Sequence, residues 1–90
     1  MTSKERAALR SLANPLTPVV FVGKEGVTEN IVKQADDVLK VRELVKGTVQ
    51  KNAGVTAEEA CRILAQQLQA EEIQVIGRRF TLYRKKPQEC

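Results

Sequence analysis

An apolar stretch followed directly by a glycine-framed loop limits the folds open to this chain more than any other feature. The run Val19–Val22 is mostly β-branched and does not alternate in polarity, which predicts a strand covered on both faces. The loop Gly23–Gly26 follows, with Lys24 near its tip, and Thr28 then begins a helical pattern. A strand that leads through so short a loop into a helix predicts a strand–helix–strand crossover, and therefore an α/β fold.

Three helices are predicted from threonine caps and from apolar residues at helical spacing. Thr2 and Thr56 are each followed three residues later by glutamate, and the helices that these capping boxes begin should run to about Ala13 and Gln69. In the helix after Thr28, the core-facing stripe is formed by Ile31, Val32, Ala35, Val38 and Leu39. In the first helix, the apolar side is formed by Ala8, Leu9, Leu12 and Ala13.

Three further strands are predicted over residues 44–50, 73–76 and 80–84, with Gly77 in a tight turn and Glu71-Glu72 at a helix end. The element order is then α-β-α-β-α-β-β. Right-handed crossovers would place the second and third helices on one face of a four-stranded mixed sheet, with the first helix covering part of the other face. The sequence thus predicts a single α/β domain packed with three helices, and with Phe21 and Phe80 in its core.

The amino-acid composition indicates where the protein is located and which kinds of chemistry it can perform. No apolar run in the 90 residues approaches the ~20 needed to cross a bilayer, and the first residues lack a signal peptide's apolar core, so a cytoplasmic protein with no membrane partner is expected. Histidine is absent, and Cys61 and Cys90 are too far apart for a zinc site of ordinary spacing. The carboxylates at 36–37 and 58–59 are adjacent, so they point in different directions on a helix. We therefore expect no enzyme, metal, cofactor or small-molecule substrate.

Positive charge is concentrated toward the two ends of the chain. Residues 1–24 carry a net charge of +3, residues 25–77 of −3 and residues 78–90 of +4, within a total of +4. If the basic segments meet in space, they form a basic face opposite an acidic one, which suits a polyanion. Besides Lys24 in the loop, the arginines available for this face are Arg6, Arg10, Arg78, Arg79 and Arg84.

The loop does not match the nucleotide-binding motifs. A Walker A loop needs lysine followed by serine or threonine after the second glycine, and a dinucleotide fingerprint needs three glycines. A G-x-x-G segment can instead press its main-chain amides against successive phosphates, as KH domains do with nucleic acid. The alternative is that the two glycines serve only a strand-to-helix turn. Because aromatic residues are few, recognition by backbone and shape is favoured over base-by-base reading.

Four segments in this order resemble the CRM-domain family (chloroplast RNA splicing and ribosome maturation), in particular its stand-alone bacterial YhbY-like members. They are residues 9–16, Val22–Thr28, Arg42–Lys46 and residues 74–84. The resemblance implies an α/β domain similar to the C-terminal domain of translation initiation factor three, spanning 1–86 and followed by a frayed tail, 87–90. Family members usually have a β-branched residue where this chain has Gly47, a departure that should weaken the second strand by ~0.5–1 kcal/mol.

The resemblance also implies RNA binding through the glycine loop and nearby basic residues. By position, the implied RNA-binding residues are Gly23, Lys24, Glu25, Gly26, Lys46, Arg78 and Arg84, and the charge layout adds Arg6 and Arg10. For the bacterial members it implies association with precursors of the large ribosomal subunit. We therefore predict a non-catalytic, monomeric protein that binds ribosomal RNA during large-subunit assembly. The alternatives are a DNA-binding chromosomal protein, or a protein-interaction module on the ribosome that uses the acidic second and third helices.

Overall fold

Each helix begins after a threonine whose hydroxyl oxygen accepts a hydrogen bond from a first-turn amide, as the sequence predicted. In the computed structural model, which describes residues 2–85, these helices are α1 (Ser3–Ala13), α2 (Glu29–Arg42) and α3 (Ala57–Leu68). Their caps are Thr2, Thr28 and Thr56, which accept from the amides of Glu5, Ile31 and Glu59 at 3.2, 3.4 and 3.1 Å. Among the described residues, no helix has the length and apolar character needed to cross a bilayer.

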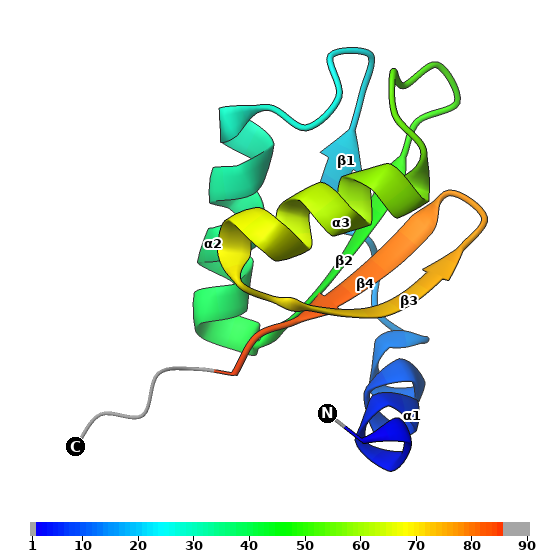
Figure 1. The fold of residues 1–90 in the computed structure, drawn as a ribbon, viewed down its shortest axis with the longest axis vertical. Coiled ribbons are helices and arrows are strands. Elements are labelled where there is room, and N and C mark those ends of the chain that lie inside the picture. The colour runs from blue at the N-terminus through cyan, green and yellow to red at the C-terminus, as the bar shows by residue number, and fades with distance from the viewer. Residues whose placement is uncertain (1, 86–90) are drawn as a thin grey trace.

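The four strands form one mixed sheet, as predicted (Figure 1). They are β1 (Val20–Val22), β2 (Leu44–Val49), β3 (Glu71–Ile76) and β4 (Arg79–Tyr83), in the spatial order β1-β2-β4-β3. β1 pairs parallel with β2, and β4 pairs antiparallel with both β2 and β3. The assignment of Glu71-Glu72 to a helix end was wrong, because α3 ends at Leu68 and Glu71 already belongs to β3. Gln69 ends the helix in the left-handed conformation, with a φ of 54°.

The main core lies between the sheet and the two crossover helices, which cover the same face (Figure 1). Its fully buried members come from all three parts: they include Val20, Val22, Val45, Phe80 and Leu82 from the strands, Ala35 and Leu39 from α2, and Ala60, Cys61 and Leu64 from α3. Burial, followed by the nearby Glu72 carboxylate, raises the pKa of the Cys61 thiol to about 12. This cysteine is therefore a core side chain and a poor nucleophile.

The opposite face of the sheet is only partly covered, so two expectations were wrong: β1 is not covered on both faces, and Phe21 is not in the core. α1 reaches this face near its C-terminal end, where Ala13 is buried, while Ala8 and Leu12 are exposed. The helix then extends away from the sheet, and its contacts are with β2, β3 and β4. Because β1 is an edge strand beyond this contact, Phe21 is 54% exposed and not a core residue. Phe80 is buried, as predicted.

Gly47 packs directly beneath the ring of Phe80, which is its partner across the β2–β4 pair. A Cβ built on Gly47 would lie 2.7 and 2.9 Å from the Cε2 and Cε1 atoms of Phe80, and closer still to Cζ. The ring therefore occupies the space that a side chain at this position would take. The glycine that appeared in the sequence as a weak point of the strand is the residue that this packing requires, since burial of the ring offsets its low strand propensity.

We expect Gly47→Ala to lower the free energy of unfolding by about 1–3 kcal/mol, because the added methyl group overpacks the core. Urea unfolding followed by circular dichroism measures this change. In a Phe80→Leu background the ring is gone, so the same substitution should cost much less. A stabilising effect of Gly47→Ala in the wild-type background would show that low strand propensity dominates and that the packing explanation is wrong.

Candidate nucleic-acid interface

The glycine loop is a tight turn, and the two amides at its tip have no hydrogen-bond partner in the described part of the chain. The amide of Gly26 donates to the carbonyl oxygen of Gly23 at 3.0 Å, and Gly26 has a φ of 77°, which favours glycine. The amides of Lys24 and Glu25 make no hydrogen bond within residues 2–85, and both residues are exposed. The turn can therefore offer two adjacent N–H groups and one ammonium group to an anion.

The start of α2 adds little to a site for an anion. Thr28 already accepts the hydrogen bond from the amide of Ile31, and the acidic Glu29 lies in the first turn. Both features compensate the positive end of the helix dipole within the chain itself. The N-terminus of this helix is thus a weak site for an anion, and the tip of the loop is the stronger element.

A second loop, between β2 and α3 (residues 50–56), packs against the glycine loop. Its first amide, of Gln50, donates to the carbonyl oxygen of Val22 at 2.9 Å. A Cβ on Gly54 would lie 3.3 Å from the carbonyl oxygen of Lys24, which shows how closely the two loops approach. This second loop brings the exposed Lys51 to the same end of the sheet. Lys51 was not among the predicted site residues, although loops that follow two parallel strands necessarily leave the sheet at the same edge.

The β3–β4 turn brings Arg78 to this end as well. The amide of Val49, the last residue of β2, donates to the carbonyl oxygen of Arg78 at 2.7 Å. Between this turn and the second loop lies a depression of about 400 Å³, whose lining includes Lys51, Gly54 and Arg78. We call the surface formed by Lys24, Glu25, Lys51 and Arg78 the loop end. Two of the predicted basic residues, Lys24 and Arg78, thus lie at the same end of the sheet.

Arg84 lies elsewhere and is held by the chain itself. Its guanidinium forms an ion pair with Asp36 at 2.8 Å and donates to the carbonyl oxygens of Leu68 and Asp36 at 3.1 and 3.3 Å. It therefore joins the end of β4 to α2 and to the end of α3. A hydrogen bond from Lys40, and then one from Arg84, lowers the pKa of the Asp36 carboxyl group. The expectation that Arg84 converges on the glycine loop was wrong, because β4 runs away from that end.

The remaining predicted residues lie on the α1 side of the molecule. Lys46 projects from β2 on the face opposite α2 and α3, where its ammonium donates to the carbonyl oxygens of Ala13 and Asn14 at 3.4 Å each. It thereby holds the C-terminal end of α1. Arg6 and Arg10 are exposed on α1. The glycine loop and α1 lie toward opposite ends of the 41 Å long axis (Figure 1), so the basic segments do not merge into one patch.

The architecture and the loop define a single-domain α/β protein with a mixed sheet and a basic turn at one sheet edge. Residues 1–84 match the model of the CRS1/YhbY (CRM) domain, and the chain belongs to this family, as its sequence motifs indicated. The solution structure of SAV1595 from Staphylococcus aureus is similar, with a TM-score of 0.82 at 37% identity, over 100% of this chain and 94% of that one.

Two relatives carry names that state a binding activity. Probable RNA-binding protein YqeI of Bacillus subtilis is 36% identical over 84 residues, which are 93% of this chain and 88% of that protein. Probable RNA-binding protein MJ0652 of Methanocaldococcus jannaschii is 41% identical over 86 residues, covering 93% of this chain and 63% of that longer protein. Relatives from a bacterium and an archaeon are thus both named as RNA-binding proteins.

The Arg84–Asp36 pair predicts a specific loss of stability in acid. Because the pKa of Asp36 is lowered in the folded state, the pair stabilises the fold above the ordinary carboxyl pKa of about 4, and this contribution is lost as the pH falls through the folded value. Asp36→Asn should cost up to about 1 kcal/mol at neutral pH, and its free energy of unfolding should fall less than that of the wild type below pH 4.

Asp37→Asn is the matched control for this acid prediction. Asp37 is the exposed neighbouring carboxylate on α2, and it forms no ion pair within residues 2–85. Denaturant unfolding at a series of pH values compares the three proteins. If Asp36→Asn and Asp37→Asn showed the same acid dependence, the pair with Arg84 would have no special part in stability.

Proposed function

We propose that this protein is a non-catalytic RNA-binding protein whose loop end binds the phosphates of the RNA backbone. The observation that carries the proposal is the exposed tip of the glycine turn, where the amides of Lys24 and Glu25 are unpaired within residues 2–85 and Lys24 supplies a positive charge. Phosphate oxygens are the ligands that such a group of donors suits best. The names of the relatives support RNA over other polyanions.

In this proposal the loop end acts as a rigid backbone clamp. The amides of Lys24 and Glu25 donate to phosphate oxygens, while the carboxylate of Glu25 takes no part. Lys51 and Arg78 lie beside the tip and extend the contact to further phosphates. The hydrogen bond between Gly26 and Gly23 and the packing of the second loop hold the turn in place before RNA arrives, so little conformational entropy is lost on binding.

We extend the proposal to the biological partner on the basis of the family resemblance. The partner is ribosomal RNA in precursors of the large ribosomal subunit, bound in the cytoplasm by one copy of the chain. Structured RNA suits a clamp that reads phosphate positions, because a folded RNA presents its phosphates in a fixed arrangement. The selectivity of this site would then come from the shape of the RNA.

The affinity for RNA should fall steeply with salt. If the three cations of the loop end neutralise about three phosphates, a plot of log K against log salt concentration should have a slope of about −2 to −3. Fluorescence anisotropy with a labelled ribosomal RNA fragment measures this slope, and duplex DNA of equal charge is the comparison. A flat response would contradict the backbone clamp, and equal affinity for DNA would favour a general nucleic-acid-binding protein.

Replacing Lys24 by alanine should weaken binding to all RNAs by a similar factor and reduce the salt slope by about one. Lys33→Ala is the matched control, because it removes the same charge from an exposed position on α2. A change in sequence preference without a change in slope would contradict a phosphate contact at Lys24.

Gly23→Asp tests the turn itself in the same assay. Gly23 does not have a positive φ, and an added Cβ would meet the flexible side chain of Gln50 at 3.3 Å, so this variant should fold. A second carboxylate at the turn, in addition to that of Glu25, should then repel phosphate and weaken binding. Gly26 is less suitable for this test, because its φ of 77° would strain any other residue. A folded Gly23→Asp variant with normal affinity would show that the glycines serve only the turn.

A further inference from the structure

One row of side chains crosses the whole sheet on the face opposite α2 and α3. The strand register places Phe21 of β1 opposite Thr48 of β2, Thr48 opposite Arg79 of β4, and Arg79 opposite Ile76 of β3. Directly paired residues project to the same side of a sheet, so these four side chains form a continuous row. The core residues that alternate with them, Val20, Val22, Val49 and Phe80, project to the other face.

Most of this row is exposed, and the end of α1 does not cover it. Phe21 is 54% exposed and Ile76 is 63% exposed, which is unusual for large apolar side chains. The guanidinium of Arg79 makes no ion pair or hydrogen bond within residues 2–85. The row therefore presents one aromatic ring, one uncommitted cation and one aliphatic side chain to solvent.

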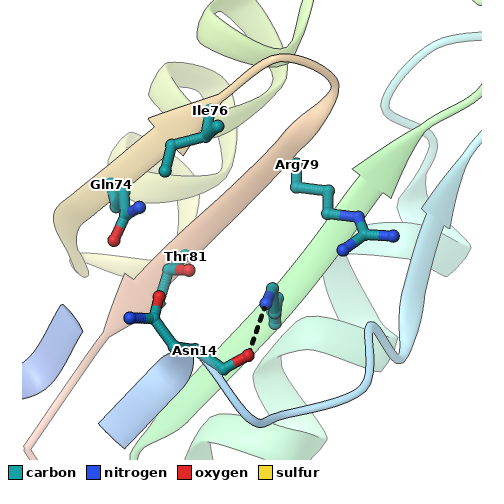
Figure 2. A pocket seen from close by; sticks show the side chains of 6 residues that line it. Asn14, Gln74, Ile76, Arg79 and Thr81 are labelled. Atoms are coloured by element: carbon teal, nitrogen blue, oxygen red, sulfur yellow. Dashed lines mark hydrogen bonds between the residues drawn. The ribbon is translucent and has the colours of Figure 1, made fainter. Parts of the chain in front are cut away.

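A depression lies beside the row, between the end of α1 and strands β2, β4 and β3 (Figure 2). Its volume is about 280 Å³, and it is lined by Asn14, Lys46, Gln74, Ile76, Arg79 and Thr81. The side-chain amides of Asn14 and Gln74 can each donate and accept, as the edges of nucleobases also do. Since the Lys46 ammonium is already bonded to the carbonyl oxygens of Ala13 and Asn14, Arg79 is the cation available to a ligand here.

Exposed basic residues lie on elements at both ends of the molecule. Lys24, Lys51 and Arg78 lie at the loop end, and Arg6 and Arg10 lie on α1 toward the other end (Figure 1). A polyanion that contacts both groups has to pass along the sheet. The charge layout thus favours a nucleic-acid strand over an apolar protein partner, whose surface would leave Arg79 buried and unpaired.

We propose that this open sheet face binds a single-stranded segment of the RNA, with one base stacked on Phe21. The inference rests on the proposed function, and it adds a second contact that differs from the loop end in chemistry. Phe21 and Arg79 are two strands apart, about 10 Å, so a neighbouring nucleotide can reach the Arg79 guanidinium and the polar depression. Stacking requires an unpaired base, because the bases of a duplex cover one another's faces.

The two contacts divide the recognition of RNA between them. The loop end holds phosphates without contacting bases, whereas the Phe21 face selects RNA in which bases are unpaired. A structured RNA with a single-stranded loop or junction next to a helix satisfies both contacts. This substrate class is narrower than structured RNA in general.

Phe21→Leu tests the inference, with Phe21→Trp as its conservative counterpart. The leucine keeps an apolar side chain at an exposed position, so the fold should be unchanged by circular dichroism. We expect Phe21→Leu to bind a single-stranded RNA oligonucleotide about fivefold or more weakly than the wild type, and to bind the corresponding duplex equally well. Phe21→Trp should keep full affinity for the single strand.

The tryptophan variant also gives a direct spectroscopic readout, because the chain has no other tryptophan. Its fluorescence should be quenched by the single-stranded oligonucleotide and unaffected by the duplex. Equal single-strand affinity of Phe21→Leu and the wild type, or no quenching of Phe21→Trp, would overturn the inference. A response of the tryptophan to an acidic peptide but not to RNA would also overturn it, and would assign the face to a protein partner.

Lys24→Ala separates this inference from the proposed function on which it rests. Suppose that Lys24→Ala lowers the affinity for both the single strand and the duplex, while Phe21→Leu lowers neither affinity. This result would support the backbone clamp and contradict the binding site on the sheet face. If the wild type binds neither RNA at low salt, both proposals fail together. If Phe21→Leu loses affinity for the single strand and keeps its affinity for the duplex, the result supports both the backbone clamp and the site on the sheet face.

Discussion

The parallel pairing of β1 with β2 is the constraint on which the fold and the candidate site both depend. The pairing extends from Val20 opposite Gly47 to Val22 opposite Val49. It requires α2 to cross one face of the sheet between the two strands, and it makes both strands end at the same edge. The glycine loop and the second loop therefore leave the sheet side by side. Without this pairing Lys24 and Lys51 would not share a surface.

The position of β1 at the edge of the sheet has a second consequence, for the face opposite α2 and α3. The end of α1 packs near the other strands and is held there by Lys46, so the ring of Phe21 remains in solvent. The core is complete without it, because α2 and α3 bury alternate residues of β1, β2 and β4. An exposed aromatic ring that stability does not require is free to serve binding.

The elements of the fold and the position of the glycine loop could be predicted from the sequence, because the signals are local. A threonine cap acts within one helical turn, and apolar spacing reports which side of a helix is buried. The partners and positions of the basic side chains could not be predicted in the same way. Arg84 carries the same charge as Arg78, yet the direction of β4 gives it Asp36 as a partner and places it away from the loop. Lys51 was not predicted as a site residue because it lies beside the glycine loop in space but far from that loop in the sequence.

By itself, the sequence determined where the helices begin, the order of helices and strands, and the basic glycine turn after an apolar strand. These properties depend on interactions between residues close together in the chain, so they can be predicted from the order of the residues. Tertiary structure alone decided that Gly47 accommodates the Phe80 ring, that Phe21 is exposed, and that the basic segments flank the sheet instead of merging. Each of these outcomes depends on which strand lies beside which, and strand order is set by packing between residues far apart in the chain.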